Sequence, residues 1–180
     1  MPQIRWENRF RGNSTKTCKC TVDGTDCRIY EPNPFNRKWF SHKFKKAGLR
    51  YEVAVCIKTG DIVWINGPFP CGRWPDLKIF RRAFAMNMLG LGEMVEADRG
   101  YRGEPQFVRL PSTYVSRSDR RAKKKARARH ETINKRLKDF SCLSKTFRHE
   151  RRLHRHCFLA AAVATQLSFE NGDRPWQIPY

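Results

Sequence analysis

The alternation of apolar and polar residues predicts strands in the first half of the chain and helices in the second. Residues 17–22 are apolar or threonine-rich and predict a strand, which the turn-like sequence Asp23-Gly24-Thr25-Asp26 ends and residues 27–30 can resume. Residues 1–16 are polar and basic and include the breaker Gly12-Asn13-Ser14, so we expect a loosely ordered lead-in before the folded part.

A β-hairpin is the clearest feature of the next stretch. Residues 49–57 and 62–65 are strand-like, and Lys58-Thr59-Gly60-Asp61 separates them as a turn. Residues 39–44 alternate aromatic and polar side chains and predict a strand ahead of the hairpin. The first half of the chain is therefore expected to form a three-stranded meander.

Helical spacing dominates after Pro75. A helix is expected from Pro75-Asp76 onwards, a short buried strand at residues 93–97, and helices at residues 118–140 and 145–170. The first of these helices places four apolar residues on one face: Leu77, Phe80, Phe84 and Met88. The order of elements favours an α/β or α+β domain on a mixed sheet, with one domain at residues 17–170 and a tail at residues 171–180.

The net charge of the chain indicates that this domain binds a polyanionic partner. The 180 residues include 37 Lys and Arg but only 17 Asp and Glu, a net charge of +20. An excess of this size favours DNA, RNA or an anionic membrane surface. The most apolar stretch, residues 158–167, is too short to span a bilayer, and no secretory signal opens the sequence. We therefore expect nucleic acid and no membrane.

The seven cysteines predict a reducing compartment, because they are odd in number and scattered along the chain. Cys18, Cys20 and Cys27 invite a zinc interpretation. A structural zinc site, however, usually has pairs with two to four residues between the cysteines, and no second pair exists. Ligands from His154, His156 and Cys157 would require the two ends of the chain to meet. Buried reduced thiols are the favoured interpretation.

Three acids are candidate metal ligands. Asp23 and Asp98 each follow a predicted strand, and in an open α/β sheet such positions face the crevice that binds substrate. Glu131 is the only carboxylate between Asp119 and Asp139, in a helix that is otherwise basic. Carboxylates suit magnesium, and two such ions can promote hydrolysis of a phosphodiester.

These acids also have an ordinary structural interpretation. Asp23 can be a turn residue, Asp98 a helix cap, and Glu131 an intrahelical partner of Arg127 or Lys135. Two other acids compete for the ligand role: Asp26, which is close to Asp23 in sequence, and Asp76. We favour a role for Asp76 at the start of its helix.

A resemblance favours the catalytic interpretation. Asp23-Gly24-Thr25 followed by Asn36-Arg37-Lys38 resembles the opening motifs of Harbinger-type DDE transposases and their domesticated nuclease relatives. Ala97-Asp98-Arg99-Gly100-Tyr101 resembles the acidic-x-Gly-Tyr motif of the family. Further segments resemble the intervening and final motifs of the family: Gly67-Pro68-Phe69, Pro75 to Arg81, and Arg129-His130-Glu131 with Asn134, Arg136-Leu137-Lys138 and Phe140. The similarity covers about residues 17 to 170.

The resemblance implies a ribonuclease-H-like fold and metal-dependent DNA cleavage or strand transfer. Asp23, Asp98 and Glu131 would be the catalytic acids and would hold Mg²⁺ or Mn²⁺, with two ions expected from the chemistry of this family. We expect the neighbouring cations to contact DNA: Arg99, Lys123, Lys124, Lys125, Arg127, Arg129, Lys135 and Lys138.

The length of chain before the first acid separates this sequence from that family. Such transposases usually carry a helical DNA-binding region before the first Asp, whereas 22 residues precede Asp23 here. We therefore expect that a separate DNA-binding protein could supply targeting, and that the protein acts in the nucleus. The alternative is a catalytically silent, domesticated remnant that acts as a DNA-binding protein.

Overall fold

A mixed β-sheet with helices on both faces forms the protein. The computed structural model describes residues 4–12, 17–83, 88–113 and 116–178. The strands are β1 (Cys18–Arg28), β2 (Phe40–Ser41), β3 (Lys46–Cys56), β4 (Ile62–Pro70), β5 (Met94–Glu96) and β6 (Val108–Arg109). The α-helices are α1 (Asp76–Ala83), α2 (Arg117–Leu137), α3 (Ser141–Ser144) and α4 (His154–Glu170). The expected α/β class with a mixed sheet is confirmed.

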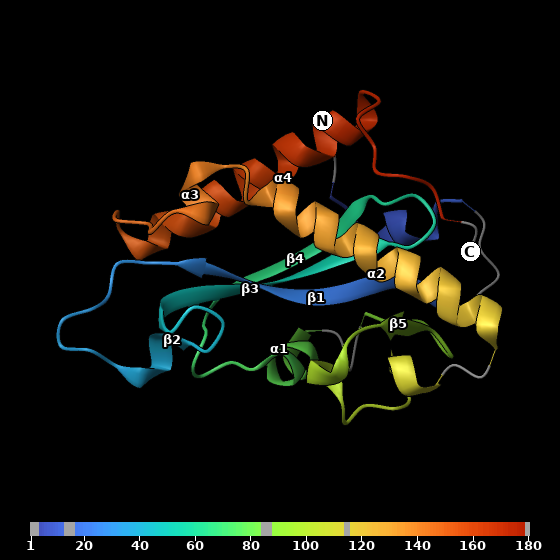
Figure 1. The fold of residues 1–180 in the computed structure, drawn as a ribbon, viewed down its shortest axis with the longest axis horizontal. Coiled ribbons are helices and arrows are strands. Elements are labelled where there is room, and N and C mark those ends of the chain that lie inside the picture. The colour runs from blue at the N-terminus through green and yellow to red at the C-terminus, as the bar shows by residue number, and fades with distance from the viewer. Residues whose placement is uncertain (1–3, 13–16, 84–87, 114–115, 179–180) are drawn as a thin grey trace.

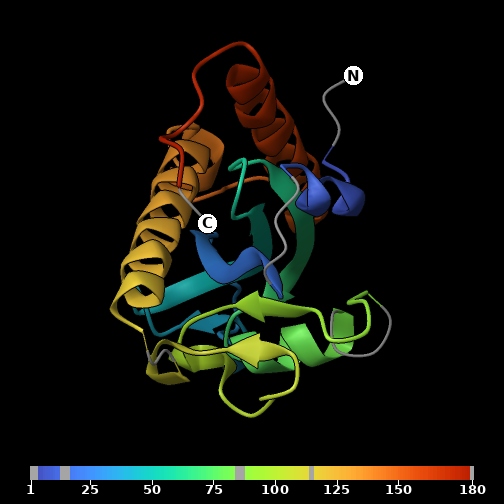
Figure 2. The same cartoon turned by 90° about the vertical axis from the view of Figure 1, so that its right-hand side faces the viewer.

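Strand β1 is the centre of the sheet. It pairs antiparallel with β3 and parallel with β5; β3 pairs antiparallel with β4 and with the short β2, and β6 extends the parallel half beyond β5. Helices α2 and α4 cover one face of the sheet, whereas α1 lies on the other (Figures 1 and 2). Strand side chains alternate between these two faces.

Each face has its own apolar core. On the α2/α4 face, Tyr51 and Val53 of β3 pack against Ile133 of α2 and Phe158 of α4. The ring of Tyr51 stacks on that of Phe158 at 3.8 Å between centroids. On the α1 face, Val22, Ala54 and Phe80 form a second cluster. This alternation fixes which face each polar residue of β1 occupies.

The expected turn at Asp23-Gly24-Thr25-Asp26 is wrong, because these residues lie inside β1. They pair in register with Val53, Glu52, Tyr51 and Arg50 of β3. A Cβ at Gly24 would lie 2.1 Å from Asp76 Oδ1. The glycine therefore leaves the space in which the Asp76 carboxylate sits against the strand. The polar residues that look like a turn are instead strand residues with long-range partners.

The last helix is shorter than expected. It begins at His154 rather than at residue 145, and α3 occupies residues 141–144. Between them, Phe147 forms a β-bridge with Ile29, where Phe147 N donates to Arg28 O at 3.0 Å and Tyr30 N donates to Phe147 O at 2.8 Å. These bonds hold the segment extended. The strand expected at residues 39–44 is also reduced, to β2.

The helix expected after Pro75 is present as α1. Leu77 and Phe80 belong to it, and Met88 lies in a turn. Phe84 lies outside the described residues. The strand expected at residues 93–97 and the helix expected at 118–140 are confirmed as β5 and α2, with small changes at their ends.

Part of the lead-in expected to be loose is packed on the sheet. Trp6–Phe10 form a 3-10 helix, and Arg9 donates two hydrogen bonds to the Glu93 carboxylate, at 2.7 and 3.0 Å, with both side chains buried. The tail is also packed: Ile178 is buried in the cluster that contains Cys18 and Ala126.

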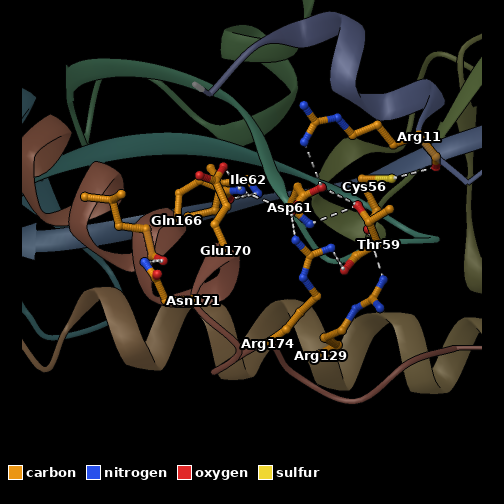
Figure 3. A network of polar contacts seen from close by, with 11 residues as sticks. Arg11, Cys56, Thr59, Asp61, Ile62, Arg129, Gln166, Glu170, Asn171 and Arg174 are labelled. Carbon is orange, nitrogen blue, oxygen red and sulfur yellow. Dashed lines mark hydrogen bonds and ion pairs between the residues drawn. The ribbon is translucent and has the colours of Figure 1, made fainter. Parts of the chain in front are cut away.

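Asp61 connects the two ends of the chain to the β3–β4 turn (Figure 3). This buried carboxylate accepts from Gln166 Nε2 of α4 and from Thr59 Oγ1, at 3.0 and 2.7 Å. Arg174 of the tail forms an ion pair with it at 3.0 Å, and Arg11 lies 3.9 Å away. One carboxylate thus links four segments that are distant in sequence.

Among the described residues, no helix is long and apolar enough to cross a membrane.

Candidate active site: an acidic pocket between β1, β5 and α2

The three sequence-predicted acids line one pocket. Asp23 comes from β1, Asp98 follows β5, and Glu131 comes from α2. Strands β1 and β5 are parallel neighbours, and α2 crosses over β1 (Figure 1). The remaining lining of this acidic pocket is Thr21, Val22, Glu96, Ala97, Lys123, Arg127 and His130. Three elements far apart in sequence therefore bring the predicted acids together.

Asp23 faces α2 and lacks an arginine partner. Its Oδ1 accepts from the Gly24 backbone N–H at 2.8 Å, and its Oδ2 accepts from Asn134 Nδ2 at 3.1 Å. Burial raises the pKa of Asp23, and the negative charge of Asp98 adds to this, while Lys43 opposes it. Within the described part of the chain, no ion pair to Asp23 is found. Its charge is therefore only partly compensated by the protein.

Asp98 and Glu131 each have a local partner as well. Asp98 Oδ1 accepts from Gly100 N at 2.8 Å and so caps the 3-10 helix Arg99–Tyr101. Glu131 Oε1 accepts from Arg127 Nε at 3.3 Å, one helical turn earlier, in a pair whose side chains are 63% and 55% exposed. An exposed pair of this kind contributes about 0.3–0.5 kcal/mol. Asp98 thus caps a 3-10 helix and Glu131 pairs with Arg127. The Glu131–Arg127 pair is weak enough for another cation to replace Arg127.

The carboxylates have the donor chemistry that Mg²⁺ or Mn²⁺ prefers, but they do not form a ready chelate. Among the described residues, no group of three or more His, Cys, Asp or Glu side chains is placed to hold a metal ion. Glu131 is turned towards Arg127, and Asp98 towards Gly100. Joint coordination would require the exposed Glu131 side chain to leave Arg127.

The histidine of α2 that lines the pocket is buried and neutral. His130 is buried, and its Nδ1 lies 2.6 Å from Thr21 Oγ1. Burial lowers the pKa of His130 to about 3, with Arg129 adding to the effect, so the ring is neutral at physiological pH. The ring therefore contacts β1 rather than the Glu131 carboxylate.

The cations predicted to contact DNA divide into two groups. Five are exposed: Arg99, Lys124, Lys125, Arg127 and Lys135. The other three make internal contacts. Lys138 Nζ donates to Asp26 O at 2.7 Å, and Lys123 Nζ donates to Arg109 O at 2.7 Å. Burial lowers the pKa of Lys123 to about 8.

Arg129 is the clearest correction among these cations. Its side chain is 1% exposed, and its guanidinium donates to Cys56 O at 2.9 Å, to Ile57 O, and to Trp176 O at 3.3 Å. It therefore ties α2 to the β3–β4 turn and to the tail. Arg129 is therefore not a phosphate contact, because its side chain is buried. Lys123 and Lys138 each donate a hydrogen bond to a backbone carbonyl, which holds their ammonium groups against the protein.

Of the two rival acids, Asp26 lies on the α1 face of the sheet, whereas Asp76 lies near Asp98: a Cβ at Gly100 would be 3.0 Å from Asp98 Oδ1 and 3.1 Å from Asp76 Oδ2. Asp26 is buried, accepts two hydrogen bonds from Arg50 at 2.7 and 3.1 Å, and accepts one from Ser41 Oγ at 2.6 Å. Burial acts to raise the pKa of Asp26, but the bonds from Arg50 and Ser41 outweigh it and lower the pKa. Asp76 starts α1, as expected, and lies 3.2 Å from the same arginine. Asp26 is thus a structural ion-pair residue.

Sequence reasoning missed several residues of the pocket. Glu96 and Thr21 line it, and Asn134 binds Asp23. A helical spacing rule could have found Asn134, because it lies three residues after Glu131 and so projects from a similar side of α2. Glu52 was also missed: it is fully buried in β3, where burial raises its pKa well above the usual value.

Burial describes the histidine and cysteine residues that the zinc interpretation would need. His154 is buried, with Nδ1 2.8 Å from Tyr51 Oη. The seven cysteines are free, and five of them are buried. Buried free thiols are what the favoured interpretation of the cysteines expects.

Comparison with protein-family models, with curated proteins and with solved structures finds no match to this chain.

Proposed function

We propose that the protein is a metal-dependent DNA endonuclease or strand-transfer enzyme of the DDE type, acting through Asp23, Asp98 and Glu131. The observation that carries the proposal is the convergence of these three acids, from three separate elements, on one pocket. The sheet is compatible with a ribonuclease-H-like domain, because a central first strand has antiparallel neighbours on one side and parallel strands on the other.

The residues would divide the work as follows. Asp23, Asp98 and Glu131 would hold Mg²⁺ or Mn²⁺, which, when bound, supplies an activated water and stabilises the leaving oxygen of the phosphodiester. The partly uncompensated charge of Asp23 beside Asp98 favours a cation between them. Exposed Lys124 and Arg127 lie near the pocket on α2 and would hold the DNA backbone over it.

Nicking of supercoiled plasmid tests this proposal. We expect nicking with Mg²⁺ or Mn²⁺, none in chelator, and at least about a hundredfold loss on Asp98→Asn or Asp23→Asn, as expected when electrostatic stabilisation at a reacting centre is removed. Asp139→Asn is the matched control: it neutralises an exposed acid just beyond α2 and should leave nicking unchanged. Full activity in purified Asp98→Asn protein would overturn the assignment.

The second candidate is a catalytically silent DNA-binding protein. The contacts that favour it are the Glu131–Arg127 pair and the Asp98 cap, which occupy two of the three acids without a metal. This candidate predicts salt-dependent DNA binding with no nicking in any metal. Nuclear action, with targeting by a separate DNA-binding protein, is part of either proposal.

A further inference from the structure

A second groove lies where β1 ends, away from the acidic pocket. One wall is the loop Tyr30, Glu31, Pro32 and Asn33. The other is the segment from Phe147 to Arg152, whose last two residues begin the 3-10 helix Arg151–Leu153. The β-bridge between Ile29 and Phe147 joins the two walls at their base. This loop–segment groove is therefore fixed by backbone pairing, at the α3 end of the molecule (Figure 1).

An exposed tyrosine lines this groove. The side chain of Tyr30 is 63% exposed, so a face of its ring is open to a stacked base. On the other wall, the Arg151 guanidinium lies 4.7 Å from the ring centroid of Trp39, which holds this planar cation in place.

The charge of the groove is moderate. Its lining contains three arginines and two glutamates, and Glu150 is ion-paired with Arg152. Arg148 is exposed and has no ion-pair partner among the residues that the structure describes. A groove with an exposed ring and a few guanidinium groups matches the way proteins bind unpaired strands, where rings stack on bases and cations follow the backbone. A duplex hides its base faces and offers a tyrosine nothing to stack on.

We propose that the loop–segment groove binds a single-stranded nucleic acid segment, with a base stacked on Tyr30 and a phosphate bound by Arg148. Asp23 and Tyr30 are seven residues apart on or just beyond β1, which corresponds to about 23 Å along the strand. That distance is about seven nucleotide steps of a B-form strand. The groove is thus far enough from the acidic pocket to bind a different part of the same molecule. The idea that the groove holds a cleaved or displaced strand rests on the proposed function. The binding of a single strand to the groove does not.

Fluorescence anisotropy in chelator tests the groove without any cleavage. The probes are labelled oligo(dT), oligo(rU) and a DNA duplex of equal length. We expect Tyr30→Ala to weaken single-strand binding about fivefold or more, because stacking contributes at least about 1 kcal/mol per base, and to change duplex binding less than twofold. Tyr30→Phe keeps the ring and should bind as the wild type does. Weakened binding of either the DNA or the RNA strand supports the proposal.

Two charge variants complete the test. Arg148→Glu should weaken single-strand binding, whereas Arg5→Glu makes the same charge change at an exposed residue beside an apolar groove and should have less effect. The proposal is overturned if Tyr30→Ala binds single strands like the wild type, or if it weakens duplex and single-strand binding equally. Because metal is absent, failure of nicking would leave this result untouched, and the two proposals can fail separately.

Discussion

Asp23 and Asp26 lie three residues apart on the same strand but have opposite environments. Asp26 faces α1 and is held by Arg50 and Ser41, so its pKa is lowered. Asp23 faces α2, accepts hydrogen bonds from the Gly24 N–H and the Asn134 amide, and has a raised pKa because of burial and Asp98. Asp26 is thus neutralised by a buried arginine, whereas Asp23 has no ion pair among the residues that the structure describes. A strand with a two-residue repeat thus separates a structural acid from a candidate catalytic one.

The largest expected change in stability comes from removing the Asp26 carboxylate, which breaks its buried ion pair with Arg50. Asp26→Ala leaves the buried Arg50 with the more distant Asp76 and the Trp74 carbonyl, so we expect a loss of about 3 kcal/mol in the free energy of unfolding, as for other broken buried pairs. Asp23→Ala should change stability by less than about 1 kcal/mol, since the cost of burying the Asp23 carboxylate opposes its hydrogen bonds and its attraction to Lys43. Urea denaturation of both variants measures this difference, and equal losses would remove the contrast.

His154 is a buried base, and it makes the stability of the protein depend on pH. Burial lowers the pKa of His154 to about 4, below its ordinary value of about 6.5. Between about pH 6.5 and pH 4, His154 is therefore protonated in the unfolded chain but neutral in the folded protein. Protonation of His154 thus lowers the free energy of unfolding as the pH falls through this range. At pH 5 the contribution is about 2 kcal/mol relative to pH 8.

His154→Gln isolates this effect. The difference in unfolding free energy between wild type and His154→Gln should shift by about 2 kcal/mol in favour of the variant between pH 8 and pH 5, because other titrating groups cancel in the difference. Denaturation series at the two pH values provide the measurement. A constant difference would mean that folding does not lower the pKa of His154.

A smaller effect is expected for the exposed acid of the pocket. If a divalent ion binds with a dissociation constant near 1 mM, 10 mM ion adds roughly 1.4 kcal/mol, or about 3 °C in melting temperature. Glu131→Gln should reduce this rise. In chelator it should cost only a few tenths of a kcal/mol, through the loss of the Arg127 pair. A variant that keeps the full metal-induced rise would show that Glu131 is only a surface ion-pair residue.

The smallest expected effect is on the free energy of DNA binding, and it comes from comparing two arginines of α2. Arg127 is exposed, whereas Arg129 is buried on backbone carbonyls. Arg127→Ala should weaken duplex binding modestly and reduce the salt slope by about 1, the value for one phosphate contact. Arg129→Met should instead lower stability and leave the salt slope unchanged. Affinity measured from 50 to 200 mM salt distinguishes them.

The sequence identifies what depends on local pattern. The hairpin β3–β4, strand β5 and helix α2 follow from their periodicity, and the meeting of Asp23 with Asp98 follows from their positions on neighbouring parallel strands. Glu131 could be selected because it is the single acid in a basic stretch of helix.

Long-range partners decide what the sequence does not predict. Asp26 is part of a strand rather than a turn because Arg50, 24 residues away, neutralises it. Arg129 and Arg127 have the same side chain on one helix, and only the position of the β3–β4 turn makes one structural. The start of α4 depends on the Phe147–Ile29 bridge, which joins residues more than a hundred positions apart.

Direct measurement of Mn²⁺ binding, by electron paramagnetic resonance on the purified protein, tests the central claim that Asp23, Asp98 and Glu131 form one metal-dependent site. The account predicts saturable binding that Mg²⁺ displaces and that Asp98→Asn weakens at least about tenfold, as for loss of a group that orients or ligates a metal. Asp139→Asn should bind as the wild type does. Equal Mn²⁺ binding by wild type and Asp98→Asn would contradict the account.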